Sequence, residues 1–450
     1  MSKHINCTDY EDCPKNVQVE NLDYKEKNSF NFLFVGCWGV YCSGKGTKIK
    51  SYDKKRNIFE EDTKSKYGQK QVVDSMVKFS DTFQQDALIL AGDNVYSDIY
   101  PSEKIQDAII KAGEDLKDIK DVEGSEQMLE VINFFIKNIN DICDCKYTEK
   151  VSKQVVLEIL EKFQTSTEAK FAFNKKINKA FKQVKSQLFN MEKQLDEGFA
   201  KCISNVKADN FFIGVGNHDI ESCDVINKQL NYHEKKWKMP ALSYNILVNM
   251  EDFDVNLIFI DTNMYDKKWC EGNYPLSAQK DQKNWLESVL SDKESTWNIV
   301  IGHVPFACDP HKETDGEIIT RVTEGLIELI ADNREKIDLY MCADEHNQHY
   351  VKYKDGNISF PPQVIAGSGG NKLDTTILES LPRDQVLLSR SVFGYVSVKV
   401  TKEKISLKFE EVPYDPSDPP RDKSKEEENF TIERKSKSLP PFHPNRSRTI

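Results

Sequence analysis

The sequence lacks any long apolar run of the kind that crosses a membrane or directs secretion. The N-terminus, MSKHINCTDYEDC, is polar and charged, and no later stretch has the apolar length of a transmembrane helix. We therefore expect no membrane span, and a cytoplasmic location by default.

The sequence also has fewer basic residues than acidic residues. The 450 residues include 62 Lys and Arg against 73 Asp and Glu, which gives a formal net charge of -11. Because phosphate backbones attract basic surfaces, this balance argues against nucleic acid as a partner. The 11 cysteines follow no repeated spacing, so the sequence favours free thiols over a disulfide framework.

Proline is absent from residues 102–239, and part of this interval has helical periodicity. We expect residues 103–198 to form a helical insertion, such as a hairpin of long helices, within a domain that spans residues 29–411. The two ends of the chain are rich in polar residues and have little apolar surface to bury. We therefore expect a polar N-terminal tail over residues 1–28 and a disordered C-terminal tail over residues 412–450.

The chain does have a repeated pattern in which a short apolar run ends abruptly and a polar cluster follows. The runs are FNFLFVG, DALILAG, FFIGVG, VNLIFI, NIVIG, DLYMCA and PQVIAG. Continuous apolar runs without alternation are typical of strands that are covered on both faces. In layered α/β folds, ligands bind at the carboxyl ends of such strands, so the polar residues after these runs are expected to converge.

Four motifs place metal-binding side chains just after a predicted strand. They are AGDNVY at 91–96, VGNHDI at 215–220, IGHVPF at 301–306 and ADEHNQH at 343–349. Carboxylates, amide oxygens, imidazoles and phenolates bind hard or borderline di- and trivalent cations. Two such ions bridged by a carboxylate can hold a phosphate ester and make a bound water more acidic. Together the motifs predict a two-metal site.

On these motifs the chain resembles the calcineurin-like metallophosphoesterases, and among them the purple acid and tartrate-resistant acid phosphatases. The resemblance extends over about residues 30–104 and 196–411, and includes YGQKQVVDSM, MPALSYNI, FIDTN, WLESVL and FGYVSVKV. It implies an α/β fold: a four-layer α/β/β/α sandwich of two mixed sheets, with the metal site at one edge of the sandwich.

The resemblance also implies roles for individual residues. Asp93 would be the carboxylate that bridges two metal ions, and Tyr96 the phenolate ligand of a ferric ion. His346 would complete the ferric site, whereas Asn217 and His303 would bind the second, divalent metal. The implied ions are iron together with iron, zinc or manganese.

Other residues are implied to act on the substrate, a phosphate ester. His218 would contact the phosphate and protonate the leaving group, while Asp219 would hold its imidazole in the productive tautomer. Asn94, His311 and His349 are further candidates for contact with the substrate.

Two positions depart from the family pattern. The family motif G-D-x-G has an aspartate as a ferric ligand where this chain has Cys37, and the motif G-H-x-H has a histidine where this chain has Asp344. A thiolate binds iron or zinc, and Asp344 supplies a charged oxygen, so both are candidate ligands. The alternatives are a buried cysteine that only fills apolar space and a carboxylate that only follows a strand.

These substitutions leave two hypotheses open. The first is a metal-dependent phosphoesterase that hydrolyses phosphomonoesters with a metal-bound hydroxide, at reduced turnover. The second is a degraded phosphatase fold that acts as a binding or scaffold protein, because some family members anchor membrane complexes instead of acting as enzymes. A protein partner would then contact the insertion at residues 103–198 and the tails.

Overall fold

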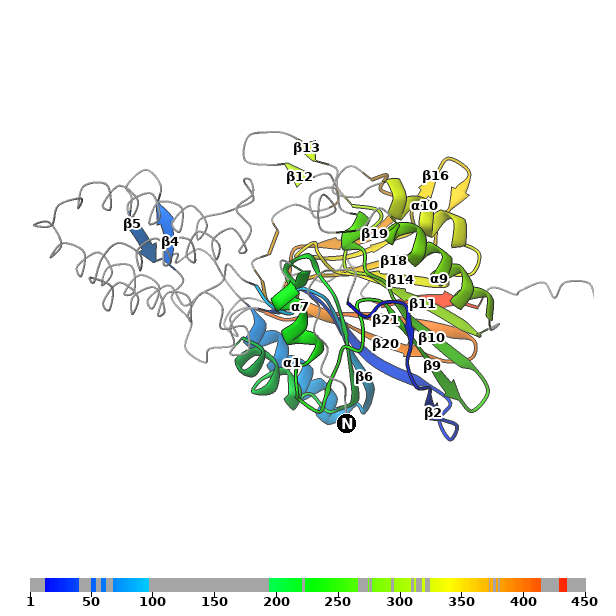
Figure 1. Cartoon of the computed structure of the whole chain (residues 1–450), viewed down its shortest axis with the longest axis horizontal. Helices are drawn as coiled ribbons and strands as arrows, with labels where there is room; N and C mark the ends of the chain where they lie inside the picture. Colours follow the sequence, from blue (N-terminus) through cyan, green and yellow to red (C-terminus); the bar gives the residue numbers. More distant parts are fainter. Residues whose placement is uncertain are drawn as a thin grey trace, which may run out of the picture.

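The computed structural model describes most of the predicted domain and leaves out most of the predicted insertion. The described residues are 13–39, 50–53, 58–61, 68–96, 194–220, 223–265, 274, 277–292, 295–308, 311–312, 318–319, 324–371, 373–374, 378, 381–413 and 429–434. Within them, two large mixed sheets pack face to face, with helices on both outer sides (Figure 1). The predicted order of layers, helix, sheet, sheet and helix, is confirmed.

One sheet has seven strands in the order β22-β21-β20-β3-β6-β7-β8. The bounds in chain order are Phe30–Val35 (β3), Gln85–Ala91 (β6), Ala208–Gly214 (β7), Trp237–Lys238 (β8), Gly394–Val400 (β20), Lys404–Glu411 (β21) and Asn429–Glu433 (β22). Strands β3, β6 and β7 run parallel to one another, so their carboxyl ends lie at the same edge of the sheet.

The other sheet has nine strands, in the order β1-β9-β10-β11-β14-β18-β15-β19 with β2 also paired to β9. The bounds are Val17–Gln18 (β1), Leu22–Tyr24 (β2), Tyr244–Met250 (β9), Asp254–Phe259 (β10), Trp297–Ile301 (β11), Leu339–Cys342 (β14), Gln348–Val351 (β15), Gln363–Ala366 (β18) and Val386–Arg390 (β19). Strands β10, β11, β14 and β18 are parallel, and their carboxyl ends also share one edge.

Helices and short elements complete the described structure. The α-helices are Gln69–Thr82 (α1), Cys223–Leu230 (α7), Ala278–Asp292 (α9) and Glu324–Asn333 (α10). Shorter helices are Asp196–Ala200 (η2), Ile203–Asn205 (η3), Asn217–Ile220 (η4) and Asn263–Tyr265 (η5). Three short strand pairs are Lys50–Asp53 with Ile58–Glu61 (β4, β5), His311–Lys312 with Ile318–Ile319 (β12, β13) and Lys354–Asp355 with Ile358–Ser359 (β16, β17).

Three buried apolar clusters hold the layers together. One lies between the two sheets, and the other two lie between each sheet and its covering helices. Representative members are Phe32 and Leu257 for the first, Leu33 and Val72 for the second, and Ile258 and Leu286 for the third. Each fully buried side chain of this size contributes about 1.5–3 kcal/mol to folding.

Strand β3 explains why the predicted strands are apolar throughout. Phe32 and Phe34 belong to the cluster between the sheets, whereas Leu33 and Val35 belong to the cluster beneath the helices. Successive strand side chains point to opposite faces, and here both faces are covered. All seven apolar runs identified in the sequence are strands in the structure.

The predicted tails are wrong in part. Strands β1 and β2 pair with β9, and strand β22 pairs with β21. Val17 and Leu22 pack against the cluster between the sheets, and Phe430 belongs to it. The edge of a sheet presents unpaired N–H and C=O groups, with which an extended segment distant in the chain can pair.

The predicted insertion lies almost wholly outside the described residues. Its last residues, 194–198, are described, and Leu195 is buried under the helices of the seven-stranded sheet. The insertion therefore stays a prediction.

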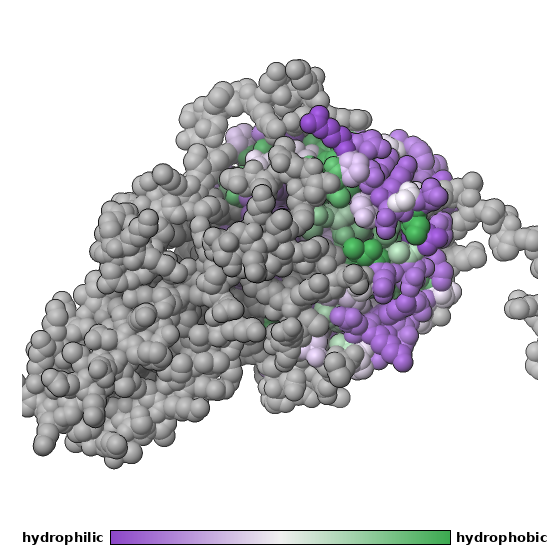
Figure 2. Space-filling model, turned by 90° about the horizontal axis from the view of Figure 1, so that it is seen from above, coloured by the Kyte–Doolittle hydropathy of each residue, from purple (hydrophilic) through white to green (hydrophobic). Residues whose placement is uncertain are grey.

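The described surface is mainly hydrophilic on the face seen in Figure 2, with scattered apolar residues. The large apolar side chains that are exposed in the described residues are Phe83, Ile358 and Leu387, which lie after α1, in β17 and in β19. Among the described helices, none combines the length and the apolar character needed to cross a bilayer.

Candidate metal centre

Three of the predicted ligands share an unusual backbone conformation. Cys37, Asp93 and Asp344 each stand two positions after the end of a strand, and their φ angles are 54°, 54° and 59°. The left-handed region is uncommon for residues other than glycine, and it costs about 1–3 kcal/mol. Such strain concentrates at functional sites. The same turn is thus retained at Cys37, where the side chain has changed.

Glycines let the loops approach one another. A Cβ on Gly216 would lie 2.3 Å from Oδ1 of Asp93 and 2.9 Å from Cε1 of His303. Gly92 has φ of 87°, and a Cβ there would lie 2.7 Å from Nδ1 of His303. The glycines before Asp93 and Asn217 are therefore required by close packing at the site.

One group of predicted ligands surrounds Nε2 of His303. Oδ1 of Asp93 lies 3.3 Å from this nitrogen, and Oδ1 of Asp344 lies 3.6 Å from it. Oδ1 of Asn217 lies at 3.1 Å. Nδ1 of the same ring is 2.7 Å from the carbonyl oxygen of Ala91, so Nδ1 carries a proton and Nε2 is the nitrogen available to a metal.

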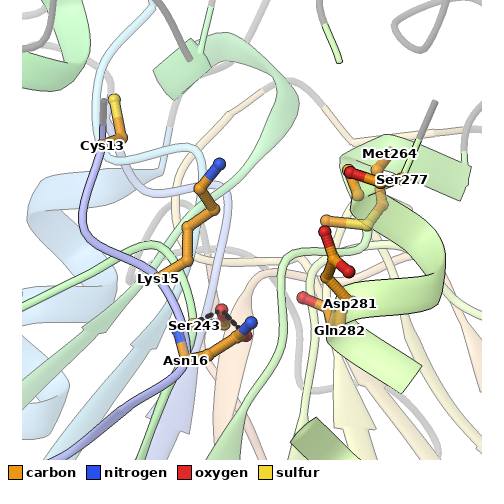
Figure 3. Close-up of a pocket in the computed structure, with 9 residues that line it drawn as sticks. Cys13, Lys15, Asn16, Ser243, Met264, Ser277, Asp281 and Gln282 are labelled. Atoms are coloured by element: carbon orange, nitrogen blue, oxygen red, sulfur yellow. Dashed lines mark hydrogen bonds between the residues drawn. The ribbon is translucent and has the colours of Figure 1, made fainter. Parts of the chain in front are cut away.

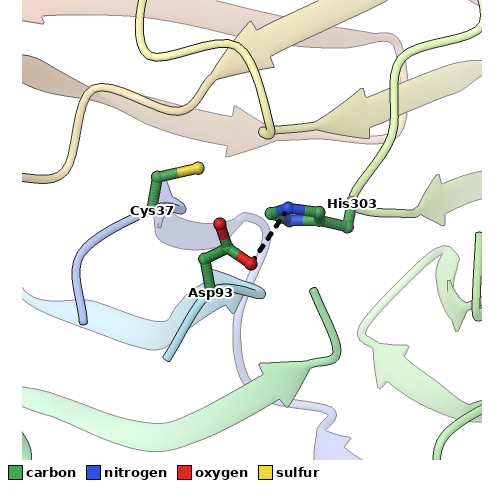
Figure 4. Close-up of side chains that lie close together, drawn as sticks. All are labelled: Cys37, Asp93 and His303. Carbon is green, nitrogen blue, oxygen red and sulfur yellow. Dashed lines mark ion pairs between the residues drawn. The ribbon is translucent and has the colours of Figure 1, made fainter. Parts of the chain in front are cut away.

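A second group lies on the other side of Asp93. Figure 4 shows Cys37, Asp93 and His303 pointing toward one another, with ligand atoms within 4.8 Å of each other. The hydroxyl of Tyr96 interacts electrostatically with the side chains of Cys37 and Asp93, and it lies 3.5 Å from Nε2 of His346. The structure therefore brings the predicted ligands into two groups that share Asp93.

The charges in this site are tightly balanced. Burial would raise the pKa of Asp93, but His303 and His218 lower it to about 2. Burial would lower the pKa of His303, but the charges of Asp93 and Asp344 raise it well above its usual value. A protonated His303 thus offsets two buried carboxylates, a role that a metal cation could take over.

The donor set fits metal binding. Three oxygens converge on Nε2 of His303, and the Cys37 thiol lies within 4.8 Å of ligand atoms of Asp93 and His303. A phenol and a second imidazole, those of Tyr96 and His346, lie 3.5 Å from each other. Sulfur, nitrogen and oxygen donors of this kind suit iron and zinc. The arrangement can therefore hold a metal cation beside Asp93.

Metal binding at this site should become tighter as pH rises. Burial and the charges of Asp93 and Asp344 raise the pKa of Cys37, and burial with Asp93 raises that of Tyr96. These groups and His303 are protonated at neutral pH, so a metal must displace protons, whereas Asp93 is already ionised. We expect the apparent affinity to rise about tenfold per pH unit for each proton displaced. Calorimetric titration with Zn²⁺ between about pH 6 and 8 measures this, and a flat profile would contradict it.

The site opens toward His218 and His346. His218 is 9% exposed and His346 is partly exposed, whereas Cys37, Asp93 and His303 are almost completely buried. The ring of His218 lies against that of Tyr96, with 4.6 Å between centroids. Its position is compatible with the predicted contact to phosphate at the open side.

The predicted role of Asp219 is wrong. Its carboxylate accepts hydrogen bonds from the backbone N–H groups of Gly216, Asn94 and Val95 and from the Asn94 amide, and not from the His218 imidazole. Burial and the charge of Asp93 raise the pKa of Asp219 to about 7, although these N–H donors oppose the shift. Asp219 therefore joins the loops after β6 and β7 instead of orienting the imidazole.

Two predicted substrate contacts are also wrong. Asn94 is buried; it accepts a hydrogen bond from the Trp38 indole at 3.0 Å and donates to Gly214 and Asp219. His349 lies inside β15 and is 1% exposed. The Asn94 side chain is bonded within the protein and the His349 side chain is buried in the sheet, so neither faces a substrate.

The third candidate for contact with the substrate is His311. Its backbone lies in β12 and pairs with Ile319, and its side chain is outside the described part of the structure. The predicted contact with substrate stays a prediction.

Three supporting residues were missed by the sequence analysis. Oγ1 of Thr262 accepts hydrogen bonds from the backbone of His303 and of the next residue, and Asp374 accepts one from the backbone of His346. Asn371 contacts the His346 ring. Thr262 lies in the FIDTN segment and Asn371 follows the strand β18, so the rule that polar residues follow strands could have found both.

A separate cavity of about 440 Å³ lies beside α9. Lys15 and Asp281 face it from opposite walls, and a hydrogen bond between Asn16 and Ser243 lies at its floor (Figure 3). None of the predicted metal ligands lines it. The chemistry described above therefore belongs to the buried ligand cluster and not to this cavity.

The family comparison agrees with the fold and the site. A family model described as calcineurin-like phosphoesterase matches residues 186–348, which contain Asn217, His303, Asp344 and His346. Over this segment the chain is similar to the calcineurin-like phosphoesterases. Members of this superfamily normally bind two metal ions, and in this chain Cys37, Asp93 and His303 form a buried cluster that could hold a metal ion.

Two solved structures that resemble this chain can be aligned over most of it. "GAP50 the anchor in the inner membrane complex of Plasmodium" is 15% identical, with a TM-score of 0.50 over 92% of this chain and 91% of that one. A purple acid phosphatase, PPD1 from yellow lupin (Lupinus luteus), is 11% identical, with a TM-score of 0.48 over 92% of this chain and 55% of that one. No curated protein sequence matches the chain.

Proposed function

We propose that this protein is a metal-dependent phosphoesterase that hydrolyses phosphate monoesters in the manner of purple acid phosphatases. The observation that carries the proposal is the position of Asp93. It is buried between two groups of donors, with His303, Asn217 and Asp344 on one side and the hydroxyl of Tyr96 on the other. A carboxylate in this position is suited to bridge two cations.

Each group of donors would hold one ion. Cys37, Tyr96 and His346 would bind the first, for which we propose iron because a phenolate and a thiolate are good ferric ligands. Asn217, His303 and Asp344 would bind the second, proposed as iron, zinc or manganese, and Asp93 would be shared. When bound, the ions would supply Lewis-acid stabilisation of the phosphate charge and a water of lowered pKa.

The protein's own residues would position the substrate and move a proton. A phosphate ester would enter from the open side, where His218 and His346 are the more exposed members of the site. We propose that the His218 imidazole donates a proton to the leaving oxygen of the ester. Its backbone N–H is bound to Oδ1 of Asp93 at 3.1 Å, so the ring is held beside the shared carboxylate.

The two substituted positions should lower turnover. Asp344 adds a negative charge where the family has a neutral imidazole, and added negative charge makes a coordinated water less acidic. The high pKa of Cys37 means that a proton must leave before the thiolate can bind. Both effects should reduce metal binding or turnover without abolishing either.

Replacement of Asn217 by alanine tests the proposal. Because the amide oxygen is 3.1 Å from His303 Nε2, its loss should weaken the second ion and lower hydrolysis of a chromogenic phosphate monoester. We expect kcat/KM to fall by about 100-fold, which corresponds to about 3 kcal/mol of transition-state stabilisation. Metal content measured on the same samples should fall as well. Unchanged turnover would remove the two-metal mechanism.

A second candidate function is a scaffold on a degraded phosphatase fold. Two observations favour it: the substitutions at Cys37 and Asp344, and the structural likeness to a protein whose title describes it as an anchor in the inner membrane complex of Plasmodium. In that case the predicted insertion at residues 103–198 would carry a protein-binding surface.

The same assay separates the two candidates when it includes Cys37→Asp combined with Asp344→His. If the wild type binds no metal and hydrolyses nothing, while the double variant gains both, the scaffold is supported. Metal and turnover in the wild type support the enzyme.

A further inference from the structure

Asn371 is fixed beside the first group of ligands by a glycine-rich turn. It follows β18 and the sequence GSGG, and its backbone N–H donates to the carbonyl of Cys37 at 3.1 Å. Gly369 donates to the carbonyl of Gly36 at 3.1 Å in the same turn. These two hydrogen bonds tie the turn to the loop that carries Cys37, so the position of Asn371 does not depend on its own side chain.

The side chain of Asn371 contacts two of the predicted ligands. Its Nδ2 is 3.4 Å from Nε2 of His346, and its amide is near enough to the Tyr96 hydroxyl to lower the pKa of that phenol. The hydroxyl and Nε2 are themselves 3.5 Å apart. Three polar atoms therefore converge, and the residue is 9% exposed.

The contacted atoms are the ones that a metal would use. A cation bound by Tyr96 and His346 must approach the hydroxyl oxygen and Nε2, and the amide N–H of Asn371 now lies against both. An N–H donor and a cation are both attracted to the same lone pairs. A half-turn of the amide about its last torsion would exchange nitrogen for oxygen without moving the backbone, because the two ends of an amide have nearly the same shape.

We propose that Asn371 is a further metal ligand, which gives its side-chain oxygen to the di- or trivalent cation held by Cys37, Asp93, Tyr96 and His346. Side-chain amide oxygens are ordinary ligands of hard cations. The amide oxygen adds a hard donor to the group in which Cys37 has replaced a carboxylate with a softer thiol. This inference rests on the proposed function, since it assumes that the site binds metal.

Metal titration of the full-length, metal-free chain tests the inference without measuring activity. Co²⁺ is added alone, and binding is followed by calorimetry and by the visible spectrum of the bound ion. Asn371→Ala should weaken one of two binding events by about 10- to 100-fold and change the cobalt spectrum. Asn371→Asp should tighten the same event, because a charged oxygen replaces a neutral one.

Matched variants make the result specific. Asn205→Ala removes an exposed asparagine amide that bonds only to nearby carbonyls, so it should leave both events unchanged. Asn217→Ala should weaken the other event. If Asn371 had only a structural role, Asn371→Asp would bind no more tightly than the wild type, and this result overturns the inference.

The Co²⁺ titration gives different results if the role of Asn371 is wrong and if the proposed function is wrong. Two binding events in the wild type, both unchanged in Asn371→Ala, would overturn the role of Asn371 and leave the metal site standing. A wild type that binds no Co²⁺ would overturn both. Thermal unfolding of each variant without metal shows whether the chain is folded.

Discussion

Replacing Asp93 by alanine is expected to remove both metal ions and to lower kcat/KM by at least about 1,000-fold, or about 4 kcal/mol. The reason is that Asp93 is the one carboxylate that both groups of donors contact, through His303 on one side and Tyr96 on the other. Loss of a ligand from one group weakens one ion, whereas loss of Asp93 weakens both. Elemental analysis and phosphatase assay of the same preparation measure the effect.

Two further variants serve as controls for the Asp93→Ala result. Asp332→Ala removes an exposed aspartate that pairs with Lys283, so its metal content and turnover should equal those of the wild type. Asp93→Asn keeps the shape of the side chain and loses its charge, and should therefore retain the fold while it loses most of the metal. Full metal content in Asp93→Ala would contradict the placement of a bridging carboxylate at this residue.

Much of the fold could be predicted from the sequence because its signals are local. The run DALILAG is apolar at every position between its ends, and the structure shows β6 covered on both faces. The residues after such strands were predicted to converge, and Asp93, Asn217 and His303 do so. This follows from parallel strands whose carboxyl ends share an edge, a property of the topology and not of the individual loops.

The errors concern interactions that join segments distant in the chain. Asp219 follows His218 directly in the motif, which suggested that it orients the imidazole, yet its carboxylate accepts from the loop after β6. The N–H groups that reach a side chain from a neighbouring loop depend on the register of the strands that carry the two loops. The spacing of residues within one motif does not specify that register. The tails were misjudged for the same reason, because β1 and β22 are held by pairing with distant strands.

At Cys37 the left-handed backbone turn is retained although the side chain differs from the family's aspartate. Asp93 and Asp344 have nearly the same φ at the same distance from their strands. Aspartate tolerates this region better than cysteine does, since its short polar side chain can bond locally. The backbone at position 37 therefore keeps the geometry of a ligand turn despite the less suitable residue, which favours a site that still holds cations over one that has only been filled.

Replacing Asp219 by alanine is expected to lower the free energy of unfolding by about 3–5 kcal/mol. The carboxylate is fully buried and accepts from the N–H groups of Gly216 at 2.7 Å and Asn94 at 2.9 Å, and from the Asn94 side-chain amide at 3.0 Å. Alanine would leave these donors without an acceptor, and each buried unpaired donor costs about 1–3 kcal/mol. Urea unfolding in the presence of a chelator measures the loss apart from any effect of metal.

Asparagine at the same position separates lost hydrogen bonds from lost volume. Asp219→Asn keeps one oxygen acceptor and nearly the same shape, so it should lose clearly less stability than Asp219→Ala. The loops after β6 and β7 carry Asp93 and Asn217, and Asp219 holds them together through Asn94 and Gly216. Metal affinity should therefore fall in the order wild type, asparagine variant, alanine variant, although Asp219 is not a ligand. An alanine variant as stable as the wild type, with unchanged metal affinity, would show that the two loops are held by other contacts.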